Sequence, residues 1–184
     1  DLVRSRGLGD VYKRQAIAVA VNFYVAIPLM AVLAILQTAV LPRFPIAGLE
    51  PQLVFLVALA WGLLRGLEEG LVWAFIAGLW LDLFSMTPLG LSSLAFMAAV
   101  AGPVLLQGVL PPRRLLVAAL MAALGTLIYL LFYAVALGLL GHGLSAAGWA
   151  GLLPIALLHA VLILPIYLLL QTIVRVTRPR RVEF

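Results

Sequence analysis

Cysteine is absent from this 184-residue chain, and charged residues make up only 10% of it. Without cysteine the chain can form neither a disulfide framework nor a thiolate metal site. The scarcity of charge is more informative, because soluble domains carry about 25% charged residues. With 65% hydrophobic residues, a chain of this size could not hide its apolar surface in a soluble core. The composition therefore indicates an integral membrane protein.

Residues able to do chemistry are also scarce. The two histidines, His142 and His159, lie far apart in the chain, whereas a metal site needs clustered His or carboxylate ligands. The sequence contains no serine nucleophile elbow, no glycine-rich phosphate loop and no pair of intramembrane carboxylates. We therefore expect no enzyme activity, no metal and no cofactor. We expect His142 to be solvated in a loop and His159 to form an interhelical hydrogen bond.

Three regions differ in composition. Residues 1–15, DLVRSRGLGDVYKRQ, have no helical period and resemble translated sequencing-adapter read-through. We treat them as a non-native or disordered leader and exclude them from functional reasoning. Residues 16–174 are expected to form a single membrane domain, because the length leaves no room for a separate soluble module. Residues 175–184 are expected to form a basic cytoplasmic tail that touches anionic lipid rather than nucleic acid.

The membrane domain divides into apolar runs separated by proline, glycine and charged residues. A membrane-crossing helix needs about 20 residues, and six runs meet this requirement within end adjustments. They cover approximately Ala16–Leu41, Pro51–Leu64, Glu69–Met86, Leu89–Leu110, Leu115–Leu140 and Trp149–Val174. Gly102-Pro103 should kink or interrupt the fourth run. The sequence thus predicts an all-α integral membrane protein, a six-transmembrane-helix bundle.

The orientation follows from Lys and Arg near the span ends, because cytoplasmic loops carry the excess of positive charge. With the N-terminus inside, the outer loops contain only Arg43. The inner segments contain Arg65, Arg113, Arg114, Arg175, Arg178, Arg180 and Arg181. Both termini are therefore expected in the cytoplasm, and the protein is expected in the bacterial cytoplasmic membrane as a multi-pass protein.

Small residues recur every four positions along the third run. Gly66, Gly70, Ala74 and Gly78 form this ladder, and Asp82 is its next member. Residues four apart are neighbours on a helix face, so the ladder predicts a ridge that another helix backbone can approach closely. The ridge could instead reflect only the general abundance of glycine in membrane helices. An acid in hydrocarbon is costly and usually faces protein or water, but Asp82 is near a helix end and could lie at the membrane interface.

Two other groups allow more than one interpretation. Glu68 and Glu69 stand beside Arg65 and could form a local ion pair or a cytoplasmic contact for a partner, and we favour the ion pair. Gly125, Tyr129 and Tyr133 repeat every four residues on the fifth run. This repeat is more typical of a packing seam than of a ligand site.

Residues 51–90 resemble the MreD family, the membrane subunit of the bacterial rod-shape system. The resemblance rests on the order of Pro51, an apolar helix, Arg65, Gly70, Gly78-Leu79, Asp82-Leu83 and Pro88-Leu89-Gly90. It implies a non-catalytic scaffold that couples peptidoglycan synthesis to cell shape through helix–helix contacts. The implied partners are an MreC-like single-span protein, a RodA-like glycosyltransferase with its class B penicillin-binding protein and, indirectly, MreB filaments. The expected packing or partner-contact residues are Gly66, Gly70, Ala74, Gly78, Asp82, Pro88 and Gly90.

Two other classes remain as alternatives. The substrate-binding component of an energy-coupling-factor vitamin transporter is similar in size and helix number. Its first helix carries an Ala-(Asn or Gly)-x-x-x-Ala pattern, from which Val21-Asn22-Phe23-Tyr24-Val25-Ala26 departs at the first position. A channel or ion-coupled transporter needs a polar path through the membrane, for which Asp82 alone is insufficient.

Overall fold

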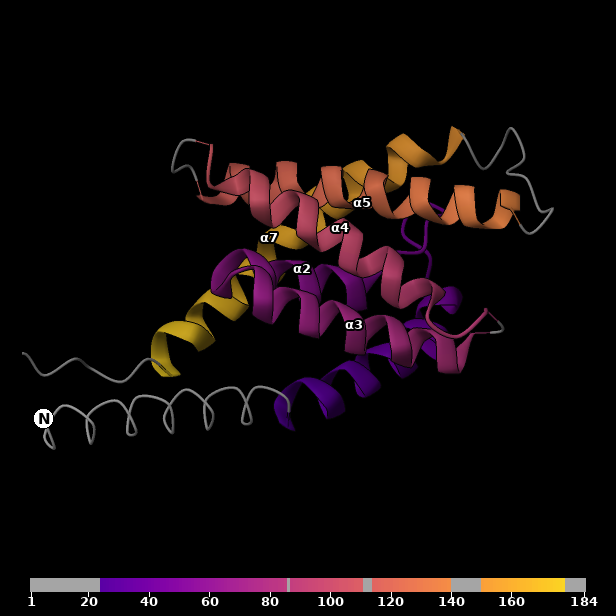
Figure 1. The fold of residues 1–184 in the computed structure, drawn as a ribbon, viewed down its shortest axis with the longest axis horizontal. Helices are drawn as coiled ribbons and strands as arrows, with labels where there is room; N and C mark the ends of the chain where they lie inside the picture. Colours follow the sequence, from indigo (N-terminus) through magenta and orange to yellow (C-terminus); the bar gives the residue numbers. More distant parts are fainter. Residues whose placement is uncertain (1–23, 86, 111–113, 140–149, 178–184) are drawn as a thin grey trace, which may run out of the picture.

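The computed structural model describes residues 24–85, 87–110, 114–139 and 150–177. Apart from one isolated bridge between Ile46 and Leu49, the regular structure of these residues is helical. The chain runs in order through a first helical segment and the helices α2, α3, α4, α5 and α7 (Figure 1). Their bounds are Tyr24–Arg43 for the first segment, Leu53–Arg65, Leu67–Phe84, Leu91–Gln107, Arg114–Leu139 and Leu152–Thr177.

The helices pack as consecutive hairpins. Gly66 alone joins α2 to α3, with a φ of 102° that a residue with a side chain rarely adopts. The closest helix pairs are α3 with α4, α5 with α7, α2 with α3 and α4 with α5, and α2 also packs on α7. The chain therefore closes on itself around α2, which contacts four of the other helices in the described part of the chain.

An aromatic cluster fills the centre of the bundle. Phe55 on α2, Phe96 on α4 and Tyr129 on α5 have ring centroids 5.2 to 6.0 Å apart. Between α2 and α3, the rings of Trp61 and Trp73 stack with centroids 4.2 Å apart. Such pairs bury large apolar surfaces in defined geometry, so they fix how α2 sits against its neighbours.

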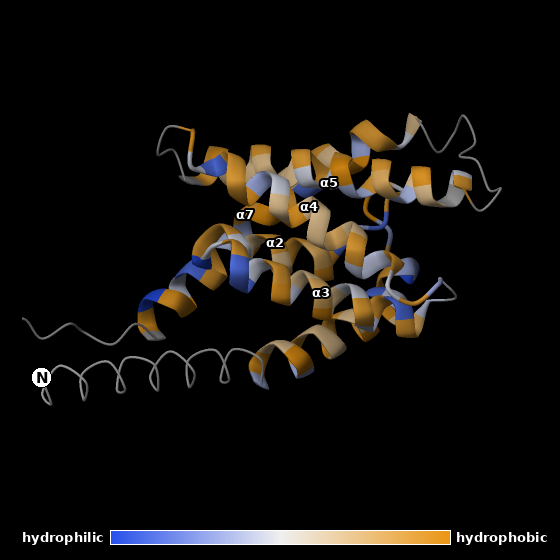
Figure 2. Ribbon diagram, viewed as in Figure 1, coloured by the Kyte–Doolittle hydropathy of each residue, from blue (hydrophilic) through white to orange (hydrophobic). Residues whose placement is uncertain are grey.

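The outer surface of the bundle is apolar as well. Large hydrophobic side chains such as Leu94, Leu131 and Val161 are more than half exposed, and hydrophobic ribbon dominates the helices in Figure 2. A helix that is hydrophobic on all sides is typical of a membrane span. Three helices are long and apolar enough to cross a membrane: Tyr24–Arg43, Leu115–Ala136 and Leu152–Val176. Helices α2 and α4 are shorter and apolar, and α3 carries three acids.

The helices agree with the six expected runs in order and approximate position, but two details differ from simple expectation. The first segment changes from α-helix to a π-helical turn at Leu36–Val40 and then to a 3-10 turn at Leu41–Arg43. Helix α4 continues through Pro103 without interruption. The leader 1–15, His142 and residues 178–184 of the tail lie outside the described residues.

A glycine on α5 lies against the turn of α4 that contains Pro103. Proline has no N–H, so the carbonyl of Ala99, four residues earlier, loses its helical donor. Gly125 lies directly against that carbonyl, because a Cβ at this position would come 2.7 Å from the Ala99 oxygen. The same Cβ would come 3.1 Å from the ring of Phe55. The repeat of Gly125, Tyr129 and Tyr133 therefore contributes to packing between α5, α4 and α2.

We predict that Gly125→Ala lowers the free energy of unfolding by about 1–3 kcal/mol, the usual cost of overpacking a tight contact. The matched control is Gly138→Ala on the same helix, where a Cβ meets nothing within 4 Å. This control should be neutral or stabilising by up to about 1 kcal/mol, because alanine favours helix over glycine. Denaturant unfolding in micelles measures both; equal stabilities for the two variants would contradict the prediction.

Candidate functional site

The carboxylate of Asp82 holds the turn between α3 and α4 together. Its Oδ2 accepts a hydrogen bond of 2.7 Å from the N–H of Gly90, and its Oδ1 accepts one of 3.0 Å from the hydroxyl of Thr87. The N–H of Ser92 lies 3.2 Å from both carboxylate oxygens. Asp82 is only 3% exposed. This acid of the third run is therefore buried against protein rather than placed in solvent at the membrane interface.

These contacts cap a helix that has no cap of its own. Gly90 is the N-cap residue of α4 and provides no side chain, so the first N–H groups of α4 need an external acceptor. A carboxylate is the strongest available acceptor, since hydrogen bonds to a charged group are about twice as strong as neutral ones. It also opposes the positive end of the helix dipole. Asp82 thus supplies from α3 the cap that α4 lacks.

Small residues on α3 allow this close approach. A Cβ on Gly78 would lie 2.3 Å from the backbone nitrogen of Ser93, so α4 begins in direct contact with the α3 backbone. The hydroxyl of Ser93 completes the contact by donating to the carbonyl of Phe75 at 3.1 Å. Gly78 therefore sets the distance at which Asp82 can reach the first turn of α4.

The other expected packing residues occupy different places in the bundle. A Cβ on Gly70 would come 2.6 Å from the Cα of Gly62 on α2, and Ala74 is fully buried. Gly66 and Gly90 form turns in open space, both with positive φ. The carbonyl of Pro88 accepts the N–H of Leu91 at 3.2 Å. The ladder thus meets α2 at one end and α4 at the other, inside this chain; contact of these residues with another protein stays a prediction.

Helix α2 receives a similar external cap at its N-terminus. The carbonyl of the Gln37 side chain accepts the N–H of Val54 at 3.0 Å, and the Gln37 amide donates to the side chain of Gln52. The backbone N–H of Gln52, the N-cap residue, donates to Nε2 of His159 at 2.9 Å. Side chains from the first segment and from α7 therefore satisfy the first donors of α2.

The imidazole of His159 links three helices. Its Nδ1 lies 2.8 Å from the hydroxyl of Thr126 on α5, and that hydroxyl donates its only hydrogen to the carbonyl of Ala122 at 2.6 Å. Thr126 must therefore accept from Nδ1, which makes His159 the Nδ1–H tautomer, with Nε2 free to accept from Gln52. The expected interhelical hydrogen bond of His159 is confirmed. Sequence reasoning missed Gln37 and Thr126, since isolated polar residues carry no periodic signal.

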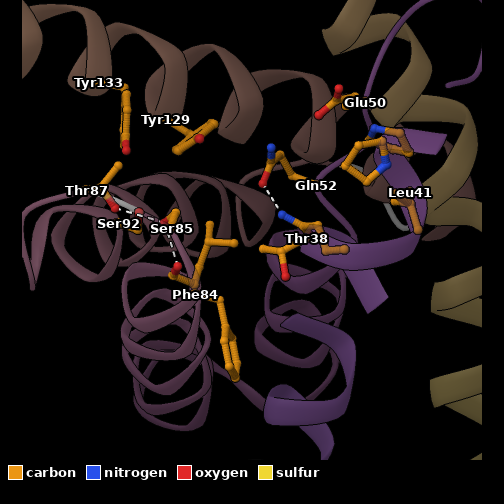
Figure 3. Close-up of a pocket in the computed structure, with 14 residues that line it drawn as sticks. Thr38, Leu41, Glu50, Gln52, Phe84, Ser85, Thr87, Ser92, Tyr129 and Tyr133 are labelled. Carbon is orange, nitrogen blue, oxygen red and sulfur yellow. Dashed lines mark hydrogen bonds between the residues drawn. The ribbon is translucent and has the colours of Figure 1, made fainter. Parts of the chain in front are cut away.

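A cavity of about 370 Å³, lined by both polar and apolar side chains, lies beside these two helix starts. Its walls come from the first segment, the loop before α2, the α3–α4 turn and α5. Figure 3 shows Tyr129 and Tyr133 of α5 on one side, above Thr87 and Ser92, with Gln52 and Thr38 on another. The hydroxyl oxygen of Ser92 is buried and has no hydrogen-bond partner. This cavity is a candidate binding site in the described part of the chain.

The charged residues Arg65, Glu68 and Glu69 lie at the opposite end of α2, where the chain turns into α3. Arg65 and Glu69 form an ion pair of 2.9 Å, and a second oxygen of Glu69 accepts the indole N–H of Trp61 at 3.0 Å. The favoured local ion pair is therefore confirmed for Glu69, while Glu68 is exposed. Among the described residues no group of three potential metal ligands gathers.

The fold and the sites define a helical membrane protein whose buried polar side chains mainly cap and join its own helices. A family model described as rod shape-determining protein MreD matches residues 19–173, so the chain belongs to the MreD family. No curated protein and no solved structure matches it. The match extends the resemblance of residues 51–90 to nearly the whole membrane domain and makes the protein a member of a cell-shape family.

We predict that Asp82→Ala lowers the free energy of unfolding by about 2 kcal/mol, because the buried N–H of Ser92 and the half-buried donors of Gly90 and Thr87 lose a charged acceptor. Asp82→Asn keeps one acceptor oxygen and should lose less. Glu68→Ala is the matched control, since it removes an exposed acid from the same helix. Thermal unfolding in lipid nanodiscs measures all three. A stability of Asp82→Ala equal to that of Glu68→Ala would show that the cap contributes nothing.

We also predict that Thr126→Val lowers the free energy of unfolding by about 1–3 kcal/mol, since it keeps the side-chain shape but leaves the Nδ1–H of His159 without an acceptor. Thr172→Val is the control, because the hydroxyl of Thr172 bonds only to Leu168 of its own helix. The comparison uses denaturant unfolding in micelles. A loss of stability in Thr172→Val as large as in Thr126→Val would exclude a special contribution of the His159 link.

Proposed function

We propose that this protein is a non-catalytic scaffold subunit of the bacterial cell-elongation complex, where it couples peptidoglycan synthesis to cell shape. The observation that carries the proposal is the MreD family match over residues 19–173. The use of the polar groups supports it: Asp82, Gln37 and His159 are engaged in holding helices together. What the molecule offers to a partner is mainly apolar helix surface.

We infer a six-span topology in the cytoplasmic membrane with both termini in the cytoplasm. Arg65 ends α2 and Arg175 lies in the last turn of α7, whereas Arg43 ends the first segment beside the cavity. The start of α2 lines the cavity, and His159 in the first half of α7 bonds to that start, so we infer that Arg65 and Arg175, at the far ends of these helices, share the opposite end. Positive residues favour the cytoplasmic side, so we infer that the cavity faces the cell exterior.

The partners we propose are an MreC-like protein, a RodA-like glycosyltransferase with a class B penicillin-binding protein, and MreB indirectly. The Gly70–Gly78 ridge contacts α2 and α4 of this chain, so the outward face of α3 is the surface of this helix that remains for an MreC-like span. Phe75, Leu79 and Leu83 form a stripe there at four-residue spacing and are 48%, 37% and 55% exposed.

Single cysteines test this face cleanly, because the chain contains none of its own. We predict that cysteines at Phe75, Leu79 and Leu83 cross-link to cysteines in the MreC-like span in membranes. Cysteines at Leu157 and Val161 on α7 provide the control, since these positions are equally apolar and exposed. Cross-linking at the α7 positions but not on α3 would show that the proposed face is wrong.

The scaffold role itself is tested by replacing the resident MreD of a rod-shaped bacterium with this chain. We expect rod shape and co-purification with the MreC-like and RodA-like proteins. The cavity favours the alternative of a vitamin-transporter subunit, which should instead co-purify with an ATPase module. Gly78→Leu is unsuitable as a partner probe, because the added side chain clashes with the α4 backbone of the same chain.

A further inference from the structure

The loop that follows the first helical segment exposes apolar side chains at the end of a membrane span. This loop, residues 44–52, connects the segment Tyr24–Arg43 to α2. Phe44 is 72% exposed and Ile46 is 44% exposed. The loop extends no farther along the bundle than the C-terminal end of α5 (Figure 1), where the apolar side chain of Leu139 is exposed. The loop therefore lies at a level where a neighbouring helix still presents apolar side chains outward.

The backbone of this region is folded so that it can lie against lipid. Irregular backbone is costly in lipid, because its polar groups find no water there. The N–H groups of Phe44, Ile46 and Leu49 donate to carbonyls of the same segment at 2.9 to 3.0 Å. Pro42 and Pro45 have no N–H group to satisfy. These backbone positions therefore do not depend on water for their donors.

A tight turn at the tip restricts the shape of the loop. Ile46 and Leu49 pair as an isolated antiparallel bridge. The two residues between them, Ala47 and Gly48, have φ values of 53° and 78°. Positive φ at both central positions is typical of a type I′ turn. The turn therefore holds Ile46 at the surface in a defined backbone conformation.

The charges of this region favour a phospholipid as the contact. Arg43 ends the span next to Phe44, is exposed, and makes no ion pair with the described residues. The acid of the loop, Glu50, lines the cavity, whereas Arg43 does not. A guanidinium at the end of a membrane span lies at the level of the lipid phosphates, and it can bind a phosphate through two parallel hydrogen bonds. A basic residue beside an exposed aromatic side chain is typical of segments that lie in the membrane interface.

We propose that the loop 44–52 is a lipid-binding surface that lies in the membrane interface. The side chains of Phe44 and Ile46 contact acyl chains just below the headgroups, and the guanidinium of Arg43 binds a phospholipid phosphate. This contact does not depend on the scaffold role, because it rests on the loop and on the span before it. Other residues of the same region line the cavity, so the contact holds one wall of the cavity at the level of the headgroups.

Spin labels on single cysteines test the depth of the loop, because the chain contains no cysteine of its own. The full chain is placed in nanodiscs of phosphatidylethanolamine and phosphatidylglycerol that hold one molecule each, so neither a partner nor a second copy can cover the loop. Collisions of the label with oxygen, which concentrates in lipid, are compared with collisions with a water-soluble nickel chelate. We expect labels at Phe44 and Ile46 to collide mainly with oxygen.

Two further positions calibrate this measurement. A label at Val161, which is exposed on α7 inside a membrane span, gives the value for lipid contact. A label at Glu50, the exposed acid of the same loop, gives the value for water contact. Collision with nickel at Phe44 and Ile46 as frequent as at Glu50 would overturn the proposal.

Substitutions of Arg43 test the phosphate contact. Arg43→Glu should repel the headgroup phosphates and shift the label at Phe44 toward collision with nickel, whereas Arg43→Lys keeps the charge and should largely preserve the depth. Neither change should move the thermal midpoint, since Arg43 is exposed and has no ion pair among the described residues. A label depth at Phe44 that Arg43→Glu leaves unchanged would also overturn the proposal.

Discussion

The contact of one buried carboxylate with the start of a neighbouring helix organises this bundle. Asp82 accepts hydrogen bonds from Gly90, Ser92 and Thr87, and these bonds join the end of α3 to the beginning of α4. The first N–H groups of a helix have no acceptor within the helix, so a helix that starts at a glycine depends on an acceptor from elsewhere in the chain. Gly78 makes the contact possible, since any side chain there would collide with the backbone of Ser93.

The same constraint explains the second polar cluster. Gln37 and His159 provide acceptors for the first donors of α2, and Thr126 fixes the tautomer that lets His159 do so. Inside α4, the carbonyl that Pro103 leaves without a helical donor lies against Gly125, so α5 approaches α4 closely at that point. At the starts of α2 and α4, side chains from other helices thus accept hydrogen bonds from the first backbone N–H groups. The apolar side chains then fill the remaining space.

Because the buried polar side chains bond mainly to other helices of the chain, two features of the molecule remain available for function. One is the lipid-facing apolar surface, which a scaffold of the MreD family can offer to the spans of other proteins. The other is the cavity between the two capped helix starts. Both caps surround this cavity, so the groups that stabilise the fold also shape its walls.

The sequence by itself determined that the chain is a helical membrane protein. With so few charged and so many apolar residues, the chain could not bury its apolar surface in water. It also determined the helix order and the small-residue ladder ending at Asp82, since both are local patterns with a regular period. Only the tertiary structure decided that the ladder faces α2 and α4 of the same chain, and that Asp82 caps α4. The structure alone also showed that Gln37 accepts the N–H of Val54 and that Thr126 accepts from His159. Each is a single polar residue without a pattern around it, and its partner depends on which distant helix lies beside it.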